Sequence, residues 1–288
     1  MTYYLLVMLS VVMFGGGFAL TDVYRKLRGG SIASSLESSF IGSAAGLVVL
    51  LLASGSGFQA TPFTVVMALI ASVNGIAFAF CSFKALEKVN LSLYSLFSML
   101  GGMVIPFFQG ILFYGEQITI AKVVCFVLVS IALALTVSRD GKAKGGAIYY
   151  AGVFTLNGLA AALTKIFTDA PYAKTDGTWY SIWIAITTLV LSGTLWLLFF
   201  RKKSEKGFTW KVAGVSAASG LINRVANLLL VIALVHLDAS LQYPMVTGGV
   251  IIVSTLICFF GKNKPSRKEI ASVVIAFLGM LALFLIKI

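Results

Sequence analysis

The sequence predicts an all-α, polytopic membrane protein with ten transmembrane helices. Of its 288 residues, 59% are hydrophobic and only 11% are charged, and the mean hydropathy is +0.99. Soluble domains average about 45–50% apolar and about 25% charged residues. A soluble fold needs a charged surface, which 22 Lys and Arg with 10 Asp and Glu cannot supply at this length. We therefore expect lipid to be the solvent for most of the surface.

A helix that crosses the bilayer needs about 20 mostly apolar residues. The stretches that meet this requirement are 3–24, 32–54, 62–83, 91–113, 119–137, 147–165, 178–200, 211–234, 239–260 and 268–287. Short connections with turn-forming residues, such as Arg28-Gly29-Gly30-Ser31, join them and leave no room for a separate soluble domain. The first stretch lacks the basic start and the cleavage site of a signal peptide, so we interpret it as the first span.

The formal net charge of +12 comes from short basic clusters between the apolar stretches. This pattern indicates orientation in a membrane and not binding to nucleic acid. Cys81, Cys125 and Cys258 lie within apolar stretches and lack the spacing of metal ligands. We expect them to be buried thiols, and we expect no metal site and no cofactor.

The chain divides into two similar halves, residues 1–138 and 146–288. A shift of 148 residues aligns the fourth stretch with the ninth and places Ala85-Leu86 on Ala233-Leu234, Ser92-Leu93 on Ser240-Leu241 and Gly101 on Gly249. A shift of 143 residues aligns the first stretch with the sixth and places Gly15 on Gly158 and Ala19-Leu20-Thr21 on Ala162-Leu163-Thr164. We interpret the second half as a copy of the first.

An odd number of spans in each half would place the second copy upside down in the membrane. Equivalent loops then differ in basic content. The connection between the second and third stretches has no Lys or Arg, whereas its counterpart holds Arg201, Lys202, Lys203 and Lys206. We expect an inverted repeat of five plus five helices around a central cavity. The basic residues follow the odd-numbered spans, which predicts that these loops are cytoplasmic and that both termini lie outside.

Several local motifs resemble those of the drug/metabolite transporter superfamily, in particular its EamA-like members, over essentially the whole chain. They are Phe14-Gly15-Gly16-Gly17-Phe18, Lys84-Ala85-Leu86, Leu91-Ser92-Leu93-Tyr94-Ser95-Leu96, Pro106, Gly115-Glu116-Gln117-Ile118-Thr119, Ala233-Leu234, Ser240 to Pro244 and Gly261-Lys262. The chain departs from the family at Phe14, where a Trp is frequent, and at Lys262, where a second Glu is usual. The resemblance implies a ten-helix secondary transporter with a cavity lined mainly by spans 1, 3, 4, 6, 8 and 9. It also implies cytoplasmic termini, in contrast to the charge pattern.

Arg224 lies near the middle of the eighth stretch, where a charge costs about 2.5–3.5 kcal/mol on insertion scales. One interpretation is a guanidinium that binds the carboxylate or phosphate of a cargo molecule. The alternatives are an ion pair between helices that locks a gate, or a span boundary placed wrongly so that the side chain reaches the interface.

Further polar side chains in the apolar stretches are candidates for substrate binding. They are the amides Asn223, Asn227, Asn74 and Asn157, and the side chains of Tyr94, Gln242 and Tyr243 on the equivalent fourth and ninth stretches. Hydrogen bonds between helices and aromatic belts at the membrane interface are the alternatives for these residues. Glu37 and Asp22 are candidates for proton coupling, with roles at turns or interfaces as the alternative. Asp22 and Lys165 occupy equivalent positions in the two halves.

The expected function is a secondary transporter that moves a small polar organic metabolite across the plasma membrane by alternating access. We expect this membrane to be bacterial. An amino acid or another anionic or zwitterionic compound is the expected cargo, drugs are a further class, and export is the expected direction. The chain has no P-loop, GxSxG, HExxH or paired-acid motif, so we expect no enzyme and no catalytic residues. A subunit that does not transport, or a membrane-embedded enzyme, is the alternative. The expected partners are the cargo, the lipid bilayer and, in a homodimer, a second copy of the chain.

Overall fold

The computed structural model describes residues 2–55, 57–89, 91–115, 118–136, 146–200, 207–234, 236–237, 239–260 and 264–286. The helices within these residues are α1 (Thr2–Arg28), α2 (Ile32–Ala53), α3 (Pro62–Leu86), α4 (Leu91–Tyr114), α5 (Ile120–Thr136), α6 (Ala147–Asp169), α7 (Gly177–Leu195), the π-helix η2 (Trp196–Phe200), α8 (Trp210–Leu234), α9 (Ala239–Phe260) and α10 (Arg267–Leu285). Each predicted stretch coincides with one α-helix, and η2 completes the seventh. Glu116, Gln117, Lys262 and the basic residues at 201–206 lie outside the described residues.

Local hydrogen bonds and backbone geometry set the ends of several helices. Gly29, with φ of 98°, ends α1, and the side chain of Ser31 then caps α2 by accepting from the backbone N–H of Ser34 at 3.2 Å. Thr61 caps α3 and Asp176 caps α7 in the same way. These caps lie in the turns that the sequence predicts.

Two helices extend further than their apolar stretches. Asp22 forms ion pairs with Arg25 and Lys26, and α1 continues to Arg28. Lys165 pairs with Asp169 at 3.6 Å, and α6 continues to Asp169. Charges spaced three or four residues apart stabilise a helix, and a hydropathy pattern does not register them.

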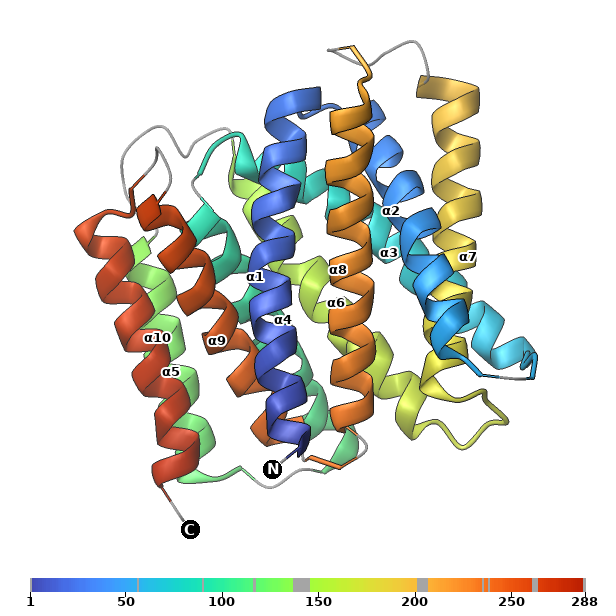
Figure 1. Cartoon of the computed structure of the whole chain (residues 1–288). Coiled ribbons are helices and arrows are strands. Elements are labelled where there is room, and N and C mark those ends of the chain that lie inside the picture. Colours follow the sequence, from blue (N-terminus) through green and yellow to red (C-terminus); the bar gives the residue numbers. More distant parts are fainter. Residues whose placement is uncertain are drawn as a thin grey trace.

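The helices form one bundle in which each long helix packs against partners from the other half of the chain (Figure 1). The principal pairs are α1 with α8, α4 with α6, α5 with α10, α2 with α8, α2 with α7, α3 with α6, α1 with α9, α3 with α7 and α4 with α9. In Figure 1, α5 and α10 lie at the left edge, α7 lies at the right, and both chain ends lie at the bottom.

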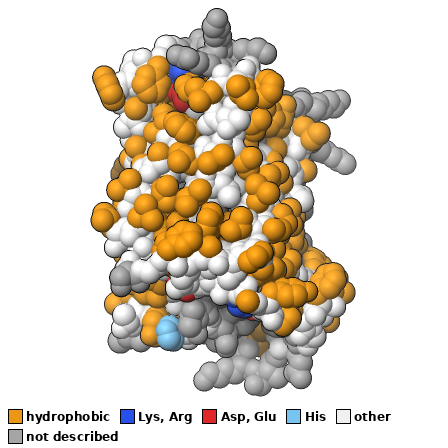
Figure 2. Space-filling view, turned by 90° about the vertical axis from the view of Figure 1, so that its right-hand side faces the viewer, with side chains coloured by type: hydrophobic (Ala, Val, Ile, Leu, Met, Phe, Trp, Pro, Cys, Tyr) orange, Lys and Arg blue, Asp and Glu red, His pale blue; other side chains and the backbone are white. Residues whose placement is uncertain are grey.

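The surface of the bundle is apolar along the helices. Leu52, Trp210 and Phe260 are 81%, 90% and 93% exposed, and Figure 2 shows hydrophobic side chains spread over the middle of one face, with charged side chains near its ends. Such large exposed apolar surfaces mark contact with a membrane. Seven helices among the described residues are long and apolar enough to cross a bilayer. The chain is therefore an all-helical, multi-pass membrane protein.

The largest core cluster fills the centre of the bundle between α1, α4 and α9, with Val11, Leu100 and Val250 almost fully buried. Cys125 and Cys258 are buried, as expected, but Cys81 is only half-buried. Its helix, α3, turns this residue partly out of the core, and an apolar stretch alone does not show which face of a helix is covered.

Candidate anion-binding site

Arg224 lies near the middle of α8, and its side chain extends between α2 and α7. The guanidinium Nη2 donates to Ser43 Oγ on α2 at 3.3 Å and to Thr188 Oγ1 on α7 at 3.5 Å. Both distances are long for hydrogen bonds. The guanidinium carries several further N–H donors, so two hydroxyl groups leave most of its capacity unused.

Glycines make this position possible. The helices α2 and α8 cross where Gly42 meets Gly220, and a Cβ on Gly220 would lie 2.1 Å from the Gly42 Cα. One turn further along α2, a Cβ on Gly46 would lie 2.5 Å from Arg224 Cγ. Small residues at such crossings bring helices close together. The absent side chain of Gly46 leaves the space through which Arg224 passes.

The hydroxyl of Thr188 connects Arg224 to α3. Thr188 Oγ1 donates to Ser72 Oγ at 2.9 Å, and Ser72 also hydrogen-bonds with the hydroxyl of Thr187. Ser192 donates to the backbone carbonyl of Thr188 at 2.6 Å and holds this turn of α7. A cluster of hydroxyl groups from α2, α3 and α7 therefore surrounds a single cation from α8. We call Arg224, Ser43, Thr188, Ser72 and Thr187 the Arg224 cluster.

Among the described residues, no Asp or Glu oxygen lies within 4.0 Å of the Arg224 guanidinium. By contrast, Arg25 and Arg28 are each paired with a carboxylate. A charge in the hydrocarbon layer is costly unless a group of opposite charge or several polar groups compensate it. The cluster offers N–H and O–H donors without a negative partner, which is the chemistry of a site for an anion.

The amides next to Arg224 point elsewhere, because successive residues of a helix face different neighbours. Asn223 faces α1: its Nδ2 donates to the Ser219 carbonyl at 2.9 Å, and a Cβ on Gly17 would lie 2.7 Å from its Oδ1. Asn227 is exposed, and its Nδ2 donates to the Asn223 carbonyl at 2.8 Å. The polar side chains predicted on α8 therefore do not form one site: Asn223 faces α1, and Arg224 belongs to the Arg224 cluster.

The amides of α3 and α6 form hydrogen bonds between helices. Asn74 donates to the carbonyl of Leu156 on α6 at 2.9 Å, and Asn157 donates to the carbonyl of Ser98 on α4 at 2.7 Å. The oxygen Oδ1 of Asn74 is buried and has no hydrogen-bond partner. Neither amide lies in the Arg224 cluster.

The candidates on α4 and α9 do not belong to the Arg224 cluster either. Tyr94 is buried, donates to Ser82 Oγ at 2.9 Å and packs edge-on against Phe18. Gln242 is buried and donates to the carbonyl of Leu230 on α8 at 2.9 Å, whereas Tyr243 is half-buried. The first two side chains contribute to packing between helices.

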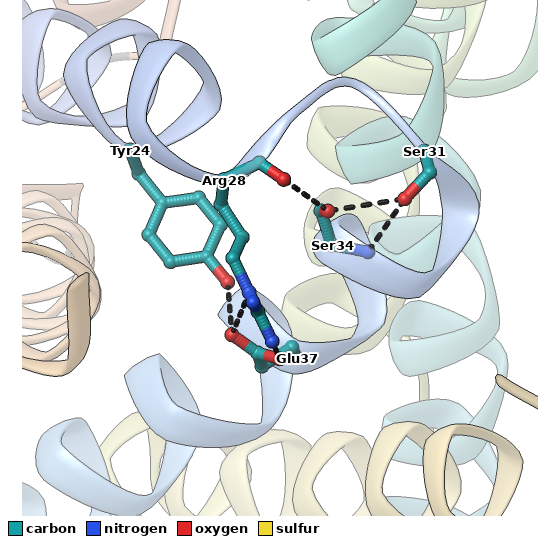
Figure 3. Close-up of polar contacts among 5 residues, drawn as sticks. All are labelled: Tyr24, Arg28, Ser31, Ser34 and Glu37. Carbon is teal, nitrogen blue, oxygen red and sulfur yellow. Dashed lines mark hydrogen bonds and ion pairs between the residues drawn. The ribbon is translucent and has the colours of Figure 1, made fainter. Parts of the chain in front are cut away.

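Glu37 belongs to a separate buried cluster at the turn between α1 and α2 (Figure 3). Its carboxylate pairs with Arg28 at 2.6 Å and accepts from the Tyr24 hydroxyl at 2.9 Å. Glu37 is 1% exposed and Arg28 is 5% exposed. In Figure 3, Ser34 and Ser31 hold the turn beside this pair, and Ser34 Oγ donates to the Arg28 carbonyl at 3.2 Å. These bonds account for the burial of Glu37, and its part in proton coupling stays a prediction.

The sequence predicts Arg224 as a site residue but does not indicate Ser43 and Thr188, which accept from it, or Ser72, which accepts from Thr188. Ser and Thr are frequent in transmembrane helices, where they bond to backbone carbonyls, so no sequence signal distinguished these three. Only the crossing of α2, α3 and α7 brings them together.

An open apolar groove of about 500 Å³ lies along α4 and α6. It is lined by Ile105, Phe108, Gln109, Leu112, Phe113, Tyr114, Ala162 and Ile166 of α4 and α6. Its lining contains none of the residues of the Arg224 cluster.

No protein-family model matches the chain, and no curated protein matches it. Among solved structures, one crystal structure of a protein is similar to this chain. The comparison gives a TM-score of 0.62 and 18% sequence identity. The similarity covers 98% of this chain and 96% of that one. At this identity the likeness shows the fold alone: the helical arrangement of the entire chain occurs in an experimentally solved protein.

Proposed function

We propose that the protein is a secondary transporter that moves a small organic metabolite with an anionic group, such as an amino acid or another carboxylate, by alternating access. The observation that carries this proposal is the Arg224 cluster. A guanidinium halfway along a transmembrane helix, whose hydrogen bonds within the described residues go to hydroxyl groups, suits a planar carboxylate that can accept two parallel N–H bonds. We further propose that the cargo is exported across the plasma membrane.

An inverted repeat is part of the proposal, and the packing of the helices supports it. Exchanging the halves converts α1 into α6, α2 into α7, α3 into α8, α4 into α9 and α5 into α10. Under this exchange the pair α1 with α8 becomes α6 with α3, and α4 with α6 becomes α9 with α1. The pairs α2 with α7, α4 with α9 and α5 with α10 are converted into themselves. Such an arrangement is expected around a pseudo-two-fold axis.

The closest contacts between α4 and α6 support the same exchange residue by residue. A Cβ on Gly101 would lie 1.9 Å from the Phe154 carbonyl oxygen, and one on Gly158 would lie 2.4 Å from Ile105 Cδ1. Adding 148 to positions 101 and 105, and subtracting 143 from positions 154 and 158, gives four positions that meet between α9 and α1.

The corresponding contacts between α9 and α1 have the same form. A Cβ on Gly249 would lie 2.6 Å from Val11 Cγ1, and one on Gly15 would lie 2.4 Å from Val253 Cγ1. Two crossings therefore use glycine at equivalent positions against an equivalent neighbour. This agreement favours ten spans in two inverted halves and membership of the drug/metabolite transporter superfamily, which we propose for the chain.

A flux assay in proteoliposomes tests the proposed function. The purified protein is reconstituted, and uptake of labelled amino acids, monocarboxylates and dicarboxylates is measured by counterflow, with and without a proton gradient. We expect at least one anionic compound to be transported, and we expect Arg224→Gln to abolish its uptake. Arg25→Gln, which removes an arginine near the end of α1, serves as the matched control. If no compound moves, or if Arg224→Gln leaves the apparent affinity unchanged, the proposal is wrong.

A further inference from the structure

We propose that the interface between α3 and α7 is the access route to Arg224, and that contacts between the α2–α3 and α6–α7 connections close this route. This inference rests on the proposed transport function and adds to it the path and the gate of the site. We call the interface the α3–α7 seam and the closing contacts the Gln59 latch, which consists of Phe58, Gln59 and Thr64 with Thr175, Asp176 and Trp183.

The seam leads from the N-terminal end of α3 to the Arg224 cluster. Thr64, Ala68 and Ser72 are spaced four residues apart, so they lie on one face of α3, and all three are buried. Each contacts α7 or the residues before it. Thr64 Oγ1 accepts from the Thr175 backbone N–H at 3.1 Å, and the Ala68 carbonyl accepts from Thr187 Oγ1 at 3.3 Å.

Ser72 completes this series. It accepts from Thr188 Oγ1, which in turn accepts from Arg224. A continuous face of α3 thus runs from the α2–α3 connection, at one end of the bundle, to the proposed anion site. Two turns of helix separate Thr64 from Ser72, or about 12 Å at 1.5 Å per residue.

Tyr180 provides an independent sign that polar species enter the seam. Its ring stacks on Phe167 with centroids 3.8 Å apart, and the residue is only 3% exposed. Its hydroxyl is buried and has no hydrogen-bond partner among the described residues. A buried hydroxyl without a partner is uncommon and costly in proteins. Tyr180 packs in one core cluster with Met67 and Ala68 of α3, so this residue belongs to the seam.

The latch joins the two halves of the chain at the outer end of the seam (Figure 1, lower right). Gln59 Oε1 accepts from the backbone N–H of Asp176 at 3.2 Å, and the Gln59 carbonyl accepts from Trp183 Nε1 at 3.0 Å. Phe58 packs edge-on against Trp183 with centroids 5.9 Å apart. These hydrogen bonds are exposed to solvent, so water can replace them when the two connections separate.

The contacts at the opposite end of the bundle differ in kind. The ion pair between Arg28 and Glu37 and the hydrogen bond from Tyr24 join α1 to α2 and lie within the first half of the chain. The same corner also contacts the second half: Arg28 lies 5.6 Å from the centroid of the Phe208 ring, and Tyr24 packs in one core cluster with Val212. The ion pair and the Tyr24 hydrogen bond are buried, whereas the hydrogen bonds of Gln59 are exposed. The Gln59 latch consists of contacts between the halves, which a motion of one half against the other must break.

The test measures how fast a water-soluble thiol reagent reaches the seam. Ala68→Cys is the reporter, in a protein in which Cys81, Cys125 and Cys258 are replaced by Ala. Ser216→Cys is the matched reporter, because a shift of 148 residues converts position 68 into 216 at the other end of the bundle. Ser216 is also buried, and its hydroxyl donates to the Ser38 carbonyl at 3.1 Å. Both reporters are labelled in detergent, without any cargo.

Gln59→Leu with Trp183→Phe removes both solvent-exposed hydrogen bonds of the latch. In this double variant we expect the reagent to label Ala68→Cys roughly tenfold faster. A tenfold shift in the opening equilibrium corresponds to about 1.4 kcal/mol. Labelling of Ser216→Cys should stay unchanged. Gln109→Leu, the same substitution in the α4–α6 groove, should change neither rate. No acceleration at position 68, or equal acceleration at both positions, would overturn the inference.

A cross-linked latch provides the reverse experiment if the double variant does not fold. Gln59→Cys with Asp176→Cys, joined through two disulfide bonds by a short bis-methanethiosulfonate, should protect Ala68→Cys from an alkylating thiol reagent until a reductant cleaves the link and is removed. Unchanged labelling after complete cross-linking would also overturn the inference. Because neither experiment requires cargo, their results separate the route from transport: a latch that gates labelling in a protein without flux leaves the route intact and refutes only the proposed function.

Discussion

Arg224 reaches the hydroxyl groups of α2 and α7 because Gly46 has no side chain. A Cβ at Gly46 would lie 2.5 Å from Arg224 Cγ and 3.1 Å from Arg224 Cβ. The position of the cation therefore depends on a residue that has no side chain.

Replacing Gly46 with Ala should displace the Arg224 side chain and weaken binding of an anionic cargo. The new methyl group overlaps the side chain, which must leave Ser43 and Thr188. We expect apparent affinity in the flux assay to fall by about tenfold, equivalent to about 1.4 kcal/mol. Gly16→Ala is the matched control, since no atom lies within 4 Å of its Cβ position. Equal affinities of the Gly46 variant and the unmodified protein would contradict the assigned role of Gly46.

Replacing Glu37 with Gln should strongly destabilise the protein. The substitution leaves the buried guanidinium of Arg28 without its carboxylate, and removing one partner of a buried ion pair costs about 3–5 kcal/mol. Thermal unfolding in detergent measures the effect. Asp22→Asn removes a more exposed pair with Arg25, and such pairs contribute about 0–1 kcal/mol. Similar melting temperatures for the two variants would argue against a structural role for Glu37.

Two buried tyrosines should respond differently to loss of the hydroxyl. Tyr94 donates to Ser82, and Tyr94→Phe should cost about 1 kcal/mol. The hydroxyl of Tyr180 has no partner within the part of the chain that the structure describes, so Tyr180→Phe should leave stability unchanged or raise it. Melting temperatures of the two variants provide the comparison. A loss of stability for Tyr180→Phe equal to that for Tyr94→Phe would show that Tyr180 has a hydrogen-bond partner.

The glycines of the α4–α6 crossing should not tolerate alanine. At Gly101, the Cβ would lie 1.9 Å from a backbone oxygen of α6, and backbone atoms can move only if the helices separate. Gly101→Ala should therefore lower the melting temperature. Gly75→Ala, where no atom lies within 4 Å, should raise stability by up to about 1 kcal/mol because alanine favours the helix. The same pattern is expected for Gly249→Ala at the α9–α1 crossing, and tolerance at both sites would argue against close helix contact.

The helical architecture could be predicted from the sequence because lipid acts on each segment separately. A backbone in hydrocarbon must satisfy its own hydrogen bonds, so a run of about 20 apolar residues becomes a helix whatever its neighbours are. Turn-forming residues such as Gly29 and Asp176 then fixed the helix ends. Only short charged extensions, such as the turn of α1 that ends at Arg28, lay beyond the apolar pattern.

The sequence by itself also determined that Arg224 requires compensation, since the cost of a charge depends on its depth in the membrane and depth can be read from position along a span. The tertiary structure alone decided what provides that compensation. Ser43, Ser72 and Thr188 lie on three different helices, and their meeting depends on how those helices cross. Crossing geometry results from close packing between glycines distant in sequence, such as Gly42 and Gly220, and no local pattern encodes such a contact.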